Sequence, residues 1–169
     1  MNNQLNLIFL ACVLSLNQGC SQKQSQPNRT EEEQVAKMLK GFYTAYIIAF
    51  EDHLKARKPG RNSLSTKIDS IQDIYLSPQL HKYLKEVNAE GLVLDFDPFL
   101  GGQMVDIQML EDMTFKKIEG DLYLVRYKFG NGYSTVKLRI VSENDNYKIA
   151  EAFFTGADGR EYELTKNIK

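Results

Sequence analysis

Two aspartates lie among large apolar residues in the segment Leu94–Gln103, "LDFDPFLGGQ". A carboxylate in apolar surroundings can act as a general base, because burial raises its pKa. Asp97 also has a structural interpretation, since it precedes Pro98 and stands where an N-cap belongs. The two apolar residues after the proline would form a turn that the glycine pair ends. This interpretation leaves Asp95 and Gln103 unexplained, and we expect them at the open edge of the domain as candidate polar residues.

Glu151 falls in a strand-like segment, 147–154, in which either of two alternating faces could be the apolar one. In one register its carboxylate shares an apolar face with aromatic and aliphatic neighbours. In the other register the alanines on either side face the core, and the carboxylate lies in water. The other candidate pocket residues are Tyr43, Tyr46 and Tyr127, whose hydroxyls could serve as acids, although buried tyrosines are more often core residues.

Other patterns with known chemistry are absent from the sequence. His53 and His81 fall on different predicted helices without metal-ligand spacing. No nucleophile elbow and no phosphate-binding glycine loop occurs, and no Ser-x-x-Lys motif is accompanied by its supporting motifs. The net charge of −1 argues against nucleic-acid binding, which requires a clustered positive field. The sequence therefore predicts a non-enzymatic protein with no metal, no cofactor and no nucleic-acid partner.

The N-terminal residues carry the clearest functional signal. The apolar run Leu5–Leu16 has signal-peptide length and is too short to span a bilayer as a helix. Gly19 directly before Cys20 at the end of this run is similar to a bacterial lipoprotein signal, which implies cleavage before Cys20 and its lipidation. Cleavage before Cys12 would leave a hydrophobic stub. Asn17 stands where the pattern prefers an aliphatic residue, so a plain secretory signal is the alternative.

This signal divides the chain into three predicted segments. Residues 1–19 are the predicted signal peptide, residues 20–29 a polar tether, and residues 30–169 a single domain of average globular composition, since the chain is 43% hydrophobic and 25% charged. The tether is rich in Gln and Ser, which is typical of a flexible linker. Ser21 is not the aspartate that retains some lipoproteins in the inner membrane. We therefore expect a lipid-anchored protein of the bacterial outer membrane that faces the periplasm.

Helices are predicted in the first half of the domain. Residues 30–57 carry apolar side chains at three- and four-residue steps, and Thr30 with Glu33 fits a capping box. A Pro-Gly pair ends this helix. Two shorter helices are predicted at 66–75 and after Ser77, which stands as a cap before a proline.

Strands are predicted in the second half, where the apolar period changes to two. The strand-like segments are 113–119, 122–129, 133–141 and 147–154. They are separated by "GD", "GNG" and "NDN", whose residues accept the positive φ of hairpin turns. The tail after residue 154 could add a short strand or a helical turn.

Helices followed by an antiparallel meander make an α+β arrangement. At this length it resembles the cystatin-like or nuclear-transport-factor-like cone, in which a curved sheet wraps a long N-terminal helix. The lipoprotein signal, the helices in "FYTAY … LSPQLHKYL" and "DFDPFLGGQ" together resemble the bacterial lipoprotein family of domain of unknown function 3828 over residues 31–154. The resemblance implies a fold and an envelope location, and it implies no catalytic residue.

Three functions are compatible with these features. The favoured one is an envelope module that binds a protein partner, because an anchor and a tether are predicted and a catalytic set is missing. The second is a small-ligand-binding protein that uses a cavity between sheet and helix. The third is an enzyme in which Asp95 or Glu151 is the base, and it requires a buried carboxylate with a raised pKa.

Overall fold

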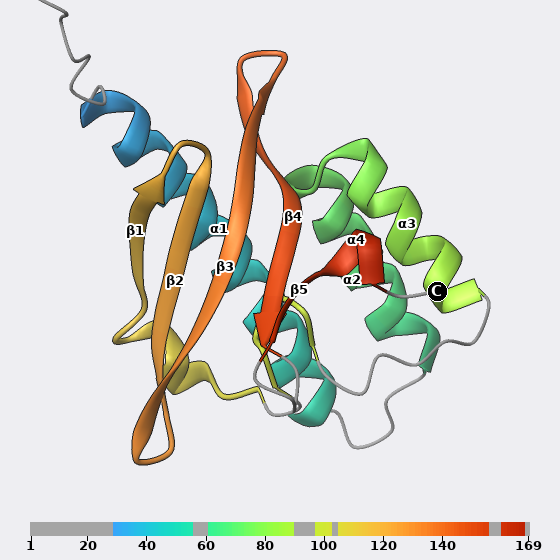
Figure 1. Ribbon diagram of the computed structural model, residues 1–169. Coiled ribbons are helices and arrows are strands. Elements are labelled where there is room, and N and C mark those ends of the chain that lie inside the picture. The colour runs from blue at the N-terminus through green and yellow to red at the C-terminus, as the bar shows by residue number, and fades with distance from the viewer. Residues whose placement is uncertain (1–28, 56–60, 90–96, 103–104, 156–159, 168–169) are drawn as a thin grey trace, which may run out of the picture.

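The computed structural model describes residues 29–55, 61–89, 97–102, 105–155 and 160–167 (Figure 1). Its strands form one antiparallel sheet in the order β1-β2-β3-β4-β5, with α1 packed along one face and α2 and α3 beside β4 (Figure 1). This is the predicted α+β arrangement, consistent with a cone-like fold. Within the described ranges, no helix is long and apolar enough to cross a membrane.

The long helix α1 spans Arg29–Lys55. It begins before Thr30, so the prediction of Thr30 as the cap was wrong. Thr30 stands inside the helix, as its second residue. Glu31 and Glu32 lie in the first turn, where the helix dipole favours carboxylates. The buried side chains of its apolar stripe are Val35, Leu39, Phe42, Tyr43, Tyr46 and Ile47.

The second helix, α2, spans Arg61–Tyr75 and begins earlier than the predicted Thr66. Leu64 is half-buried and stands four residues before half-buried Ile68, so the apolar stripe extends one turn toward the N-terminus. The predicted boundary was late because most residues before Thr66 are polar and hide this periodicity.

The third helix, α3, spans Pro78–Ala89 and begins where the sequence predicts. The Ser77 Oγ accepts a hydrogen bond from the Leu80 N–H at 3.3 Å, which confirms Ser77 as the cap. The buried stripe of the helix consists of Leu80, Leu84 and Val87.

The four predicted strands are present, and their bounds differ from the prediction by at most two residues. The strands are β1 (Thr114–Glu119), β2 (Leu122–Phe129), β3 (Gly132–Glu143) and β4 (Asn146–Thr155). A 3-10 helix, η1 (Ile107–Leu110), precedes them. The tail adds β5 (Glu161–Glu163), which pairs with β4, and the short helix α4 (Leu164–Asn167).

Tight turns join the first four strands. Gly120 and Gly130 have φ of 50° and 57°, and Asn144 and Asp145 have φ of 49° and 63°. Each of these positions lies in one of the predicted hairpin turns, where positive φ matches the twist of the flanking strands. The turn chemistry of the sequence therefore sets the register of the meander.

The sheet has an inner face toward α1 and an outer face on the other side. The buried inner-face residues of β2 and β3 are Tyr123, Val125, Tyr127, Val136, Leu138 and Ile140. The outer face of β1–β3 carries Thr114, Lys116, Ile118, Glu119, Leu122, Leu124, Arg126, Lys128, Tyr133, Thr135, Lys137, Arg139, Val141 and Glu143. Among the described elements, no helix lies over this part of the outer face (Figure 1).

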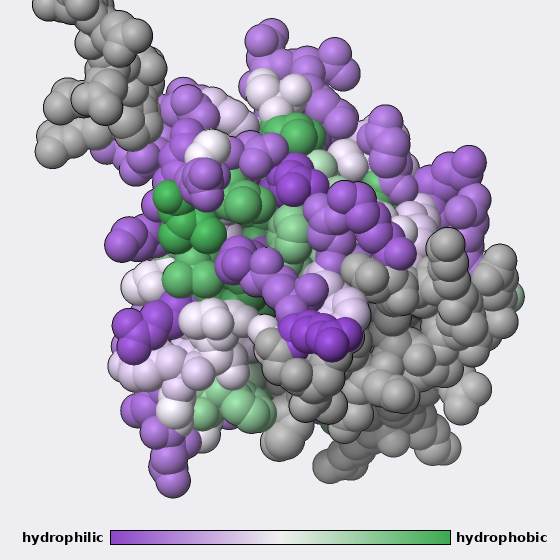
Figure 2. Space-filling view, viewed as in Figure 1, coloured by the Kyte–Doolittle hydropathy of each residue, from purple (hydrophilic) through white to green (hydrophobic). Residues whose placement is uncertain are grey.

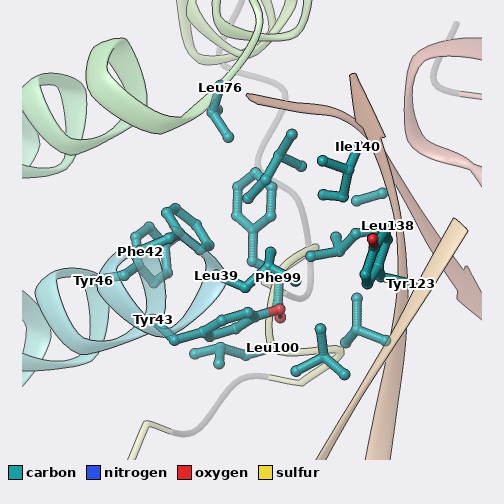
Figure 3. Close-up of a cluster of buried hydrophobic side chains, with 14 of the residues drawn as sticks. Leu39, Phe42, Tyr43, Tyr46, Leu76, Phe99, Leu100, Tyr123, Leu138 and Ile140 are labelled. Atoms are coloured by element: carbon teal, nitrogen blue, oxygen red, sulfur yellow. Dashed lines mark hydrogen bonds between the residues drawn. The ribbon is translucent and has the colours of Figure 1, made fainter. Parts of the chain in front are cut away.

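Phe99 lies at the centre of the core between α1 and the sheet (Figure 3). Its side chain is 0% exposed. Its ring meets the rings of Phe42 and Tyr46 edge to face, with centroids 5.2 Å and 5.7 Å away. Such pairs add to the free energy gained from apolar burial. The segment that carries Phe99 is therefore held to α1 by aromatic packing.

Candidate functional site

The turn at residues 97–102 has the geometry predicted from its sequence. The Asp97 Oδ1 accepts hydrogen bonds from the N–H groups of Phe99 at 2.8 Å and Leu100 at 3.0 Å. The Asp97 N–H donates to the Gly102 carbonyl at 2.8 Å and closes the turn. Gly101 has a φ of 55°, which L-residues with a side chain rarely adopt. Asp97 is therefore confirmed as the residue that caps this turn.

Three tyrosines, all predicted as pocket residues, converge on this turn from α1 and β2. The Tyr46 hydroxyl donates to the Asp97 Oδ2 at 2.8 Å. The Tyr43 hydroxyl donates to the backbone carbonyl of Phe99 at 2.7 Å. The Tyr127 hydroxyl donates to the backbone carbonyl of Leu100. Each hydroxyl thus satisfies an acceptor of the turn, and together they fix it between the helix and the sheet.

Burial sets the electrostatics of this cluster. Desolvation raises the pKa of Tyr43 and Tyr46 well above the ordinary tyrosine value, and the charge of Asp97 raises both further. Desolvation also raises the pKa of Asp97, although its hydrogen bonds from Tyr46 and two backbone N–H groups favour the carboxylate and oppose the shift. The tyrosines therefore stay protonated and act as donors to the turn.

Asp97→Asn should remove a pH dependence of stability. Because folding raises the pKa of Asp97, its favourable contribution is complete below about pH 3.9, the ordinary value, and is lost as the pH rises through the raised value. Near neutral pH, Asp97→Asn should be at least as stable as the wild type. Asp97→Ala removes the acceptor of the turn and should lose about 1 kcal/mol or more. Urea unfolding at acidic and neutral pH measures both effects.

The Asp97 prediction has a clear contrary outcome. It would be contradicted if the wild type gained stability relative to Asp97→Asn as the pH rises. It would also be contradicted if Asp97→Ala were as stable as Asp97→Asn at neutral pH, since the capping bonds would then contribute nothing.

The interior between α1 and the sheet is filled by side chains (Figure 3). Two clefts that border α1 lie at the surface of the described part of the chain. One of about 620 Å³ lies between α1 and α2, and one of about 700 Å³ is bordered by α1, α2 and the β3–β4 turn. Neither is lined by Tyr43, Tyr46 or Tyr127. The three tyrosines therefore belong to a packed core and line neither cleft.

Glu151 is buried, at 4% exposure, beneath Thr165 of α4, and neither simple alternation predicted for its strand is correct. Arg139 pairs with Glu151 whereas Ile140 pairs with Ile149, so the register shifts by one residue within β4. This bulge resets the alternation, and Ile149 and Ala152 are both fully buried. A period-two pattern cannot anticipate such an insertion.

The Glu151 carboxylate holds the C-terminal segment. Its Oε1 accepts from the N–H of Ala152 at 3.0 Å and of Thr165 at 3.2 Å, and its Oε2 accepts from the Thr165 hydroxyl. Tyr83 of α3 adds a hydrogen bond from its hydroxyl to the Leu164 carbonyl at 3.0 Å. Both oxygens of the Glu151 carboxylate therefore accept hydrogen bonds that join α4 to the sheet. This carboxylate makes none of the hydrogen bonds of the tyrosine cluster.

His81 forms a second buried polar group that the sequence did not single out as a site. Its Nε2 lies 2.9 Å from the Asp69 Oδ1, and its Nδ1 lies 3.6 Å from the Asp73 Oδ1. The Lys85 Nζ also contacts Asp69, at 3.1 Å, and both partners lower the pKa of Asp69. The two ring nitrogens face different carboxylates, so this arrangement joins α2 to α3. No group of metal-binding side chains occurs among the described residues.

The remaining predicted site residues, Cys20, Asp95 and Gln103, lie outside the described residues. The structure brings together Tyr43, Tyr46 and Tyr127 and adds Asp97 to them. Sequence reasoning treated Asp97 only as a cap, because its partner Tyr46 is 51 residues away along the chain. No local pattern carries that contact.

Comparison with known proteins gives one structural likeness. The chain is similar to a protein of unknown function from Bacteroides thetaiotaomicron VPI-5482, known from a crystal structure at 2.10 Å resolution. The sequences are 21% identical, the match covers 73% of this chain and 92% of the other, and the TM-score is 0.59. A likeness at this identity shows the fold alone. No protein-family model and no curated protein matches the chain, so the resemblance to the lipoprotein family stays a prediction.

Proposed function

We propose that this protein is a lipid-anchored, non-enzymatic protein of the bacterial envelope. Its domain binds a protein partner through the outer face of β1–β3. The anchor is proposed from the N-terminal sequence, in which Gly19 and Cys20 end an apolar run. Eight residues, 21–28, separate Cys20 from Arg29, the first residue of α1. Fully extended, they reach about 30 Å, so the domain would stay close to the membrane.

The observation that carries the proposal is the apolar surface of the outer face. Ile118 is 43% exposed, and Leu122, Leu124 and Val141 are half-buried without a covering helix among the described elements. Figure 2 looks onto this face and shows green surface over β1–β3 bordered by purple polar side chains. A contiguous apolar patch with a polar rim is typical of a protein–protein interaction site.

The filled interior favours a surface contact over a deep pocket. A small-ligand site usually needs a concave apolar cavity that buries most of the ligand. Between α1 and the sheet, the described residues pack Phe42, Tyr43, Phe99 and Tyr127 at 2% exposure or less. The hydroxyls of Tyr43 and Tyr127 are already bound to the turn at 97–102. The surface patch is therefore the feature best suited to binding.

Site-specific crosslinking in intact cells tests the proposal. A photoreactive amino acid replaces Ile118 on the outer face or, as the control, Leu54, which is 69% exposed on α1. We expect a discrete protein adduct from position 118 and none from position 54. Adducts of equal yield from both positions, or only uncrosslinked protein from both, would contradict the proposed interface.

A further inference from the structure

The outer face carries cations that have no carboxylate partner among the described residues. Lys116, Arg126 and Lys128 are exposed, and no described carboxylate lies within ion-pair distance of them. On the neighbouring strand β3 the situation is different, since Lys137 pairs with a glutamate of β5 and Arg139 pairs with carboxylates at 3.3 Å and 3.5 Å. The outer-face cations that lack a described carboxylate partner therefore lie on β1 and β2.

These cations follow the alternation of the strands. Lys116 is the cross-strand partner of Leu124, and Arg126 and Lys128 follow Leu124 at steps of two residues on the same face. Residues two apart on a strand are separated by about 7 Å. An extended chain with carboxylates at alternate positions has the same spacing, so it could place one acidic group opposite each cation.

Arg126 is held in a defined orientation. Its guanidinium carbon lies 3.8 Å from the centroid of the Tyr133 ring. A guanidinium that stacks on an aromatic ring keeps the N–H groups at its edge available for a bidentate carboxylate contact. Tyr133, which is 59% exposed, places aromatic surface beside these cations.

The position of these groups favours a protein over the lipid surface. Glu31 in the first turn of α1 contacts Lys117 near the end of β1 at 3.2 Å, so the N-terminal end of α1 lies beside the β1–β2 turn. Arg126 and Tyr133 lie toward the opposite end of these strands, at the β2–β3 hairpin (Figure 1). A cationic surface meant for phospholipid headgroups would be expected at the anchored end instead.

We infer that the partner presents an extended acidic segment, with Asp or Glu at alternate positions, to Lys116, Arg126 and Lys128 on the outer face. This inference rests on the proposed function and adds the chemistry of the partner to it. The carboxylates of the segment would point toward the sheet and replace the water around the three cations, while its intervening residues would point away from the sheet.

The test uses the purified full-length protein in a nonionic detergent. The probe is a fluorescent peptide of alternating glutamate and valine, and its reference is the same peptide with glutamine in place of glutamate. Fluorescence anisotropy should show binding of the acidic peptide that weakens with added salt. The double variant Arg126→Gln/Lys128→Gln should lower the affinity by at least about tenfold, because two charge-assisted contacts are lost.

A matched control removes the same charge elsewhere. Lys37 and Lys40 are exposed on α1 and have no ion pair among the described residues, so Lys37→Gln/Lys40→Gln should change the affinity by less than about twofold. Equal losses in both double variants would overturn the inference, since the peptide would then respond only to net charge. Binding of phosphatidylglycerol vesicles, but not of the acidic peptide, through Arg126 and Lys128 would also overturn it.

The outcomes separate the inference from the proposed function. If position 118 gives its adduct in cells while Arg126→Gln/Lys128→Gln changes neither the adduct nor the binding of the acidic peptide, the interface stands and the acidic chemistry is wrong. If the acidic peptide binds as expected while no adduct forms at position 118, the cationic site stands and the proposed protein interface is wrong.

Discussion

Phe99→Ala should destabilise the domain by about 3–5 kcal/mol. The Phe99 ring is fully buried and contacts Phe42 and Tyr46, so its removal leaves a cavity that the surrounding rings can fill only in part. The turn that carries it would also lose its apolar anchor to α1. A loss of this size is a large fraction of the roughly 5–15 kcal/mol that stabilises an ordinary domain. Urea unfolding followed by circular dichroism measures the change.

Phe129→Ala is the matched control, because the same side chain is removed from a position that is 40% exposed at the end of β2. We expect this variant to lose no more than about 1 kcal/mol. If the two variants differ by less than about 1 kcal/mol, Phe99 is not at the centre of the core and the account of the 97–102 turn is wrong. Neither substitution removes a backbone hydrogen-bonding group of the turn. The difference in unfolding free energy between the two variants therefore measures the contribution of the buried Phe99 ring.

Cys20→Ser should abolish fatty-acid labelling and release the protein from the membrane fraction. The proposed anchor is formed on the Cys20 sulfur, and serine lacks that sulfur. Each buried methylene of an acyl chain contributes about 0.8 kcal/mol to membrane binding, so loss of the chains removes most of the affinity. Metabolic labelling with a clickable fatty acid, followed by fractionation, measures both properties.

Cys12→Ser supplies the control for the anchor, since Cys12 is the other cysteine of the chain and lies within the apolar run. It should leave both labelling and membrane association unchanged. Labelling that persists in Cys20→Ser and disappears in Cys12→Ser would move the processing site. Labelling that is absent from the wild type would favour the plain secretory signal instead.

Local rules in the sequence were sufficient for most of the fold. Ser77 before Pro78 located the start of α3, and the turn residues Gly120 and Asn144 separated the strands. Both kinds of signal depend on a few neighbouring residues, because a cap satisfies nearby N–H groups and a turn requires positive φ. The start of α2 was less accurate because Leu64 stands alone among polar residues.

Long-range contacts explain what the sequence could not predict. The hydrogen bond between Tyr46 and Asp97 joins segments that are 51 residues apart. The local sequence predicts Asp97 only as a cap, and this distant contact also makes it the partner of a buried tyrosine. Glu151 was considered on two alternating faces, yet the bulge in β4 and its contacts with Thr165 decide its surroundings. Both cases depend on how distant segments pack, which a periodicity does not encode.

The partner interface on the outer face is the central claim, and native electrophoresis of solubilised envelopes tests it most directly. Wild-type protein should migrate in a complex that is larger than the protein alone. Ile118→Asp, which places a charge on the exposed apolar patch, should dissociate that complex, whereas Leu54→Asp on α1 should leave it intact. A wild-type protein that migrates only as the isolated chain, or a complex that survives Ile118→Asp and is lost with Leu54→Asp, would contradict the account.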